Sequence, residues 1–157
     1  MVEISFYHLQ KTPLEKSLPR LLEKIYAAGK RIVVLIETEE RLRDLDAQLW
    51  TYSTQSFLPH GSARDGSPEN HPIWLTRTLE NPNDASVLVV IEGEEITDFN
   101  SFEKCLDLFN GYDEESVRHA RKRWQHYRQK GYTLTYWFQD EKSGWCKKEV
   151  GQQAISN

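Results

Sequence analysis

The sequence predicts an α/β protein in which helices cover both faces of a mostly parallel sheet. Short apolar runs typical of buried strands alternate with segments whose apolar residues recur three or four positions apart, as in amphipathic helices. Alternation of this kind is typical of parallel strands joined by helical crossovers. With 157 residues, 38% of them hydrophobic, we expect one domain over residues 1–157.

The first unit is a strand, a helix and a second strand. Residues 2–9 and 31–36 are rich in apolar residues and are the two expected strands. Between them, leucines at helical spacing predict a helix that begins with Thr12 as N-cap and Pro13 in the first helical position. Gly29 is expected to end this helix.

A second helix is expected from Thr38, its N-cap, to Trp50, because acidic residues follow Thr38 and leucines recur at helical spacing. Residues 51–72 are then rich in Ser, Pro, Gly and Asn, as exposed loops are. Within them, the apolar island at residues 57–60 is expected to form a short strand.

Two further strands are expected at residues 73–76 and 86–91, separated by a turn. Residues 102–109 fit both helical and strand spacing, and we favour a strand that follows a bend.

The last strong helix is expected at residues 116–130 and is terminated by Gly131. A strand follows at residues 132–138, because its residues are β-branched and aromatic. Residues 139–157 are expected to be a peripheral extension with a hairpin around Ser143. The elements together predict a three-layer α/β/α, Rossmann-like domain.

Two other features bear on where the protein works. No stretch approaches the roughly 20 apolar residues of a membrane-spanning helix, and Cys105 and Cys146 show no disulfide or zinc spacing. We therefore expect reduced thiols, a cytoplasmic location and no membrane partner.

Charge is segregated along the chain. Residues 118–130 contain six Lys and Arg residues and no Asp or Glu, which gives a local charge of +6. Because the net charge of the chain is −4, the remaining residues carry a charge of −10. Such a footprint indicates a local site for an acidic partner rather than a surface that wraps nucleic acid.

The sequence gives little support for an enzymatic function. The turn at residues 8–13 has no glycine, so neither GxGxxG nor GxxxxGK[ST] is available to hold a phosphate. His119 and His126 lie about 10 Å apart along one helix, too far to share a metal ion. His60 is a conceivable general base, but no nucleophile motif accompanies it. We expect no cofactor, no metal site and no catalytic residue.

Four acidic residues close to the end of the expected strand at residues 86–91 also lack metal-site spacing, and we interpret them as a solvated loop. They are Glu92, Glu94, Glu95 and Asp98.

A stripe on the basic helix is the strongest candidate site. At 100° per residue, Val117, Arg121, Trp124 and Arg128 fall in one narrow stripe with Gln125 at its edge. Neither arginine has an acid three or four positions away on the helix. Paired guanidinium groups beside an aromatic ring suit a ligand with carboxylates and an apolar anchor. Single-stranded nucleic acid, stacked on Trp124, is the rival ligand.

The sequence resembles the chi subunit of bacterial DNA polymerase III, a clamp-loader accessory protein. The resemblance covers nearly the whole chain and is most specific where the pair Leu49-Trp50 is followed by residues 56–60, Ser-Phe-Leu-Pro-His. Ala120-Arg121, Tyr127-Arg128 and Gly131-Tyr132 add weaker matches.

The resemblance implies that the basic helix binds the acidic, phenylalanine-ended tail of single-stranded DNA-binding protein. Carried over by position, Arg121 is the principal site residue, Arg128 also matches, and Trp124 stands where relatives commonly have tyrosine. Val117 and Gln125 stand where relatives can have lysines, so two anion contacts are missing here.

A second contact implied by the resemblance, with a psi subunit or a helicase-type partner, involves Trp50, Phe57 and Pro59. Core packing is an equal explanation of the two aromatic residues. The resulting hypothesis is a non-catalytic replication adaptor that meets nucleic acid only indirectly. The alternatives are a metal-assisted phosphodiester hydrolase that uses His60 and a direct binder of single strands.

Overall fold

The structure is a computed structural model that describes residues 2–10, 12–51, 58–99, 101–140, 142 and 144–148. In chain order its helices and strands are β1 (Glu3–Leu9), α1 (Leu14–Ala27), β2 (Ile32–Ile36), α2 (Glu39–Thr51), β3 (His60–Ser62), the 3-10 helix η1 (Pro68–Asn70), β4 (Ile73–Thr76), β5 (Val87–Ile91), β6 (Lys104–Asn110), α3 (Glu114–Gln129), β7 (Thr133–Gln139) and β8 (Trp145–Lys148).

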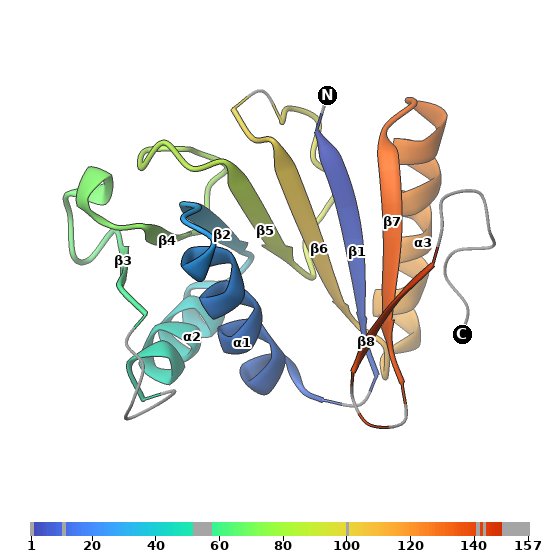
Figure 1. The fold of residues 1–157 in the computed structure, drawn as a ribbon, viewed down its shortest axis with the longest axis horizontal. Coiled ribbons are helices and arrows are strands. Elements are labelled where there is room, and N and C mark those ends of the chain that lie inside the picture. The colour runs from blue at the N-terminus through green and yellow to red at the C-terminus, as the bar shows by residue number, and fades with distance from the viewer. Residues whose placement is uncertain are drawn as a thin grey trace.

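The described strands form one sheet in the order β3-β4-β2-β5-β6-β1-β7-β8. All neighbours pair in parallel except β7 and β8, which are antiparallel. Helices α1 and α2 cover one face, and α3 lies against the other (Figure 1). The predicted α/β class with a mostly parallel sheet is confirmed.

An apolar cluster on each face of the sheet holds the layers together. Phe6 of β1 packs under α3 with Tyr127, whereas its neighbour Tyr7 belongs to the opposite cluster with Leu22 of α1. Successive side chains of a strand point to opposite faces, so β1 contributes to both clusters. Each fully buried side chain of this kind contributes about 1.5–3 kcal/mol of hydrophobic free energy.

The start of α1 differs from the prediction. Pro13, not Thr12, is the N-cap, and its carbonyl oxygen accepts hydrogen bonds from the amides of Lys16 and Ser17, both at 3.1 Å. The Thr12 hydroxyl is hydrogen-bonded to Ser17 Oγ and accepts a second bond, of 2.7 Å, from Nε2 of Gln139. The Thr12 hydroxyl, which the sequence pattern assigns to the N-cap of the helix, is therefore used in these hydrogen bonds instead.

The other helix ends follow the sequence more closely. Thr38 caps α2 by accepting a hydrogen bond of 3.2 Å from the Arg41 amide. Gly29 and Gly131, at φ of 81° and 85°, end α1 and α3 as predicted. Helix α3 begins at Glu114, two residues before the predicted start.

Three strand predictions have different outcomes. The strand expected at residues 102–109 is present as β6, which runs from Lys104 to Asn110. A hairpin does form, but its first strand is β7, so it begins before residue 139. The short strand β3 begins at His60 instead of spanning residues 57–60. Pro59 has no N–H to give to a neighbouring strand, which accounts for the later start. Phe57 lies outside the described residues.

Candidate binding site on helix α3

Helix α3 is stabilised at both ends by its own sequence. The side chain of Asp113 accepts a hydrogen bond of 3.1 Å from the Glu115 amide, which satisfies one of the free donors of the first turn. Glu114 and Glu115 lie in that turn, and Arg128 lies in the last, so the charges complement the helix dipole. The basic residues are thus held on a well-defined helix.

The predicted stripe divides into a buried and an accessible part. Trp124 is only 7% exposed, and its ring packs edge-on against Phe6, with ring centroids 5.2 Å apart. Val117 is buried as well, whereas Arg121 is half-buried and Arg128 is exposed. Trp124 therefore belongs to the core cluster under α3 and does not present its ring to solvent.

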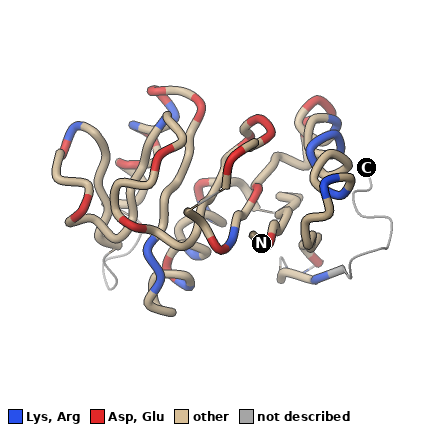
Figure 2. The backbone as a smooth tube through the Cα atoms, turned by 90° about the horizontal axis from the view of Figure 1, so that it is seen from above, with Lys and Arg blue, Asp and Glu red and all other residues tan. Residues whose placement is uncertain are grey.

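The accessible part forms a polar flank along α3, which we call the arginine flank: Arg121, Gln125 and Arg128. Gln125 is exposed like Arg128. Figure 2 shows basic residues along much of α3, at one end of the elongated molecule. Ala120 and Tyr127 of the same helix are buried in the core.

One of the six basic residues of residues 118–130 is not at the surface. The guanidinium of Arg123 donates two hydrogen bonds, of 2.7 and 2.8 Å, to the two carboxylate oxygens of Asp107 on β6. Both side chains are buried, at 6% and 3% exposure. Burial raises the pKa of Asp107, and the adjacent guanidinium limits that rise. Arg123 therefore fixes α3 to the sheet and contributes little to an external ligand site.

The acidic segment after β5 is not simply a solvated loop. Glu95 pairs with His126 and, at 3.9 Å, with Lys130 on α3. Glu92 pairs with Arg41 of α2 at 2.5 Å. These contacts correct the prediction for two of its four acids. The contacts of Glu95 also partly neutralise the side of α3 that carries His126 and Lys130.

His8, at the end of β1, lies close enough to Arg121 for the arginine's charge to affect the pKa of His8. Its Nδ1 is 2.6 Å from the hydroxyl of Tyr136, and the ring is 1% exposed. Burial and, secondarily, the Arg121 charge lower the pKa of His8 to about 4. Gly111 lies against the ring, where a Cβ atom would collide with it. His8 is thus a neutral structural residue beneath α3.

The second predicted contact region lies at the far end of the sheet. Trp50 is 54% exposed, so core packing does not explain it, and its ring centroid is 4.8 Å from that of His60. Pro59 is half-buried.

His60 itself is enclosed by protein atoms. Its Nδ1 lies 2.7 Å from the carbonyl oxygen of Leu58, and its Nε2 lies 3.0 Å from Oδ1 of Asp46. Both ring nitrogens face protein groups, which fits a structural residue better than a general base. Among the described residues, no cluster of His, Cys, Asp or Glu side chains could hold a metal ion.

The turn between β1 and α1 is filled by a side chain from the opposite end of the chain. Oε1 of Gln139 accepts hydrogen bonds from the amides of Gln10 and Thr12, at 3.0 and 3.3 Å. In phosphate-binding α/β proteins the amides of this turn meet the ligand. Here the protein itself uses two of them.

Comparison with known proteins gives the family. The model of the family described as "DNA polymerase III chi subunit, HolC" matches residues 1–135. The chain belongs to this family. Membership confirms the resemblance seen in the sequence and places the chain among the accessory subunits of a replicative polymerase.

Several bacterial chi subunits are similar to this chain. A probable DNA polymerase III subunit chi of Rickettsia prowazekii is 37% identical over 109 residues, which are 69% of this chain and 66% of that protein. The chi subunit of Escherichia coli is 26% identical over 110 residues, covering 69% and 74%. That of Haemophilus influenzae is 28% identical over 119 residues, covering 73% and 80%.

The chi-family match ends at residue 135, so most of β7 and all of β8 lie beyond it. No helix among the described residues is both long and apolar enough to span a membrane. Neither cysteine forms a disulfide: Cys105 is buried, and Cys146 is partly exposed.

Proposed function

We propose that the chain is a non-catalytic adaptor that couples the DNA polymerase III clamp loader to the acidic C-terminal tail of single-stranded DNA-binding protein. The observation that carries the proposal is the arginine flank of α3. It offers two guanidinium groups near the surface of α3, a helix on which Arg123 is buried and Arg118 and His126 pair with nearby acids. Membership of the chi family supplies the replication context.

The chemistry of the flank suits a carboxylate-rich peptide. A guanidinium can hold a carboxylate by two parallel hydrogen bonds, and a flexible tail can place several carboxylates along the helix. Val117 and Trp124 support the flank from the core because their side chains are buried. They are positioning residues in this proposal, and Arg121, Gln125 and Arg128 make the contacts.

The clamp-loader side of the adaptor is assigned to the surface around Trp50. A tryptophan that is 54% exposed offers a large apolar contact, of the kind that often dominates protein interfaces, and its ring neighbour His60 directly follows Pro59 in the chain. We propose a psi-type subunit, or a helicase, as the partner there. Phe57 is included in this proposal only because of its position in the sequence, since it lies outside the described residues.

Calorimetric titration of the full chain with a ten-residue Asp-rich peptide ending in Pro-Phe tests the tail contact. Replacement of Arg121 or Arg128 by Ala should weaken binding by about 1.5–3 kcal/mol, because each substitution removes a charged hydrogen bond. Lys130→Ala is the matched control: it removes the same charge from the same helix, on the side that faces Glu95. Its affinity should stay within about twofold of the wild type.

Equal affinity of all four proteins would reject the arginine flank as the site. Two further assays separate the alternatives. A direct binder of single strands would bind oligo(dT) with steep salt dependence and without competition from the peptide. A hydrolase would cleave a phosphodiester substrate when divalent metal is added. Either result would replace the adaptor function.

A further inference from the structure

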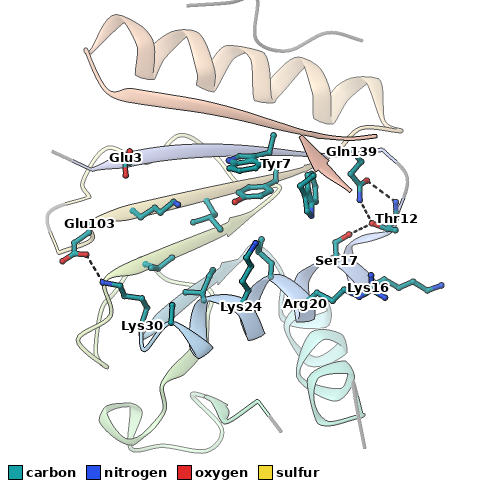
Figure 3. Close-up of a pocket in the computed structure, with 18 residues that line it drawn as sticks. Glu3, Tyr7, Thr12, Lys16, Ser17, Arg20, Lys24, Lys30, Glu103 and Gln139 are labelled. Atoms are coloured by element: carbon teal, nitrogen blue, oxygen red, sulfur yellow. Dashed lines mark hydrogen bonds and ion pairs between the residues drawn. The ribbon is translucent and has the colours of Figure 1, made fainter. Parts of the chain in front are cut away.

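A groove on the other face of the sheet is lined by residues that the arginine flank does not use. It encloses about 560 Å³ between α1 and the strands β1, β6 and β7, with Trp145 of β8 at one end. Figure 3 shows Tyr7 of β1 on the sheet side of the groove and Lys24 of α1 on the helix side.

Within the part of the chain that the structure describes, α1 and α2 are the only helices on this face, and they cover only part of it. Helices α1 and α2 pack together and over β2 and β4, whereas β1, β6 and β7 lie toward the other edge of the sheet. Parallel sheets normally have both faces covered. The floor here is apolar, with Tyr7 and Leu106, and α1 adds Leu21 and Ile25, both partly buried.

The aromatic rings of the groove are arranged for packing against apolar side chains. Tyr7 stacks in parallel on Trp137, with ring centroids 5.8 Å apart and 3° between the planes, and Trp145 meets Tyr7 edge-on at 5.1 Å. Tyr7 is itself only 7% exposed. Since these rings already pack on one another, little ring face remains for nucleic-acid bases, which need an open face to stack on.

The α1 side of the groove carries a row of positive charge. Lys16, Arg20 and Lys24 follow one another at four-residue spacing, and all three are exposed. At 1.5 Å per residue, their positions are about 6 Å apart along the helix. Lys104 and Lys30 add two more cations. The lining has two acids, Glu3 and Glu103, and Glu103 pairs with Lys30 at 3.8 Å.

The groove also contains a buried donor. Nε1 of Trp137 has no hydrogen-bond partner among the residues that the structure describes. A buried indole N–H without an acceptor costs free energy.

We propose that this groove binds an amphipathic helix of a partner protein, with the partner's apolar face on Leu21, Ile25 and Trp145 and its acidic flank against Lys16, Arg20 and Lys24. Acidic residues four apart on such a helix repeat at the same spacing as the three cations. The α1 residues that line the groove run from Lys16 to Ile25, which is about 14 Å along the helix axis. Trp137 and Trp145 lie beyond the part of the chain that the chi-family model matches.

The test is selection of a phage-displayed library of 16-residue peptides against the full chain. Enriched peptides should carry apolar residues three or four apart and acidic residues four apart. A synthetic peptide of that sequence should gain helical circular dichroism on binding. It should bind at least tenfold more weakly to the Lys16→Glu/Arg20→Glu/Lys24→Glu variant and to Trp145→Ala.

The matched control is Arg118→Glu/Lys122→Glu/Lys130→Glu, which makes the same charge change on α3 and should leave the affinity unchanged. Thermal denaturation of every variant checks that the fold is intact. The proposal is overturned if no sequence is enriched or if the groove variants bind as the wild type does. It is also overturned if oligo(dT) binds in the groove, or if sedimentation shows a dimer that the groove variant abolishes.

Discussion

Arg123 and Asp107 show how a single residue can change the meaning of a charge pattern. In the sequence, Arg123 is one of six cations on a basic helix, and in the structure it is buried in a bidentate ion pair. The sequence does contain one sign of this ion pair. Asp107 interrupts an apolar strand, where a lone carboxylate needs a partner, but the pattern does not say which of many cations provides it.

Replacement of Asp107 by Asn should lower the free energy of unfolding by about 3–5 kcal/mol, because the Arg123 charge stays buried without its counter-ion. Urea denaturation measures the loss. Asp44→Asn, on an exposed position of α2, is the control and should change stability by less than about 0.5 kcal/mol. A loss under 1 kcal/mol for Asp107→Asn would show that the pair does not hold α3 to the sheet.

The pKa of His8 gives a prediction about pH. The folded protein holds this pKa at about 4, below the ordinary value of 6.5, so between these pH values the unfolded chain binds more protons. Stability therefore falls as pH falls from 6.5 to 4, by up to about 3 kcal/mol from this residue. Urea denaturation at pH 7 and pH 4.5 should show a smaller difference for His8→Gln than for the wild type. Identical pH dependence of the two proteins would rule out this role.

At the scale of elements, the sequence predicts the order of helices and strands because periodic burial leaves a periodic pattern. It predicts poorly what depends on distant partners. The sequence pattern misplaces the start of α1 because the Thr12 hydroxyl accepts a hydrogen bond from Gln139. That residue lies 127 positions away, so no local pattern reveals the contact. Likewise, helical spacing placed Trp124 in the right stripe but did not show that Phe6 and Tyr136 enclose it.

Gln139 should be important for the turn between β1 and α1. Gln139→Leu removes the acceptor of the Gln10 and Thr12 amides and should cost about 1–3 kcal/mol of stability. Hydrogen exchange should show both amides less protected, with little change for Gln129→Leu at an exposed position of α3. Unchanged protection of these amides would mean that the side chain does not organise the turn.

At the scale of the whole molecule, three surfaces are separated in space. The arginine flank lies on one face of the sheet, the α1 groove lies on the other, and Trp50 lies near the β3 edge. Separation of this kind allows an adaptor to hold several partners at once. The sequence predicts the fold class and the basic helix. The uncovered part of the sheet can be recognised only from the three-dimensional arrangement of α1, α2 and β8.

Nuclear magnetic resonance mapping tests the central claim most directly. Backbone amide signals of the isotopically labelled chain are recorded as the Asp-rich peptide ending in Pro-Phe is added. The shifts should be concentrated on α3 around Arg121, Gln125 and Arg128, and they should disappear in Arg121→Ala/Arg128→Ala. Shifts concentrated at the α1 groove or around Trp50, with α3 unaffected, would contradict it.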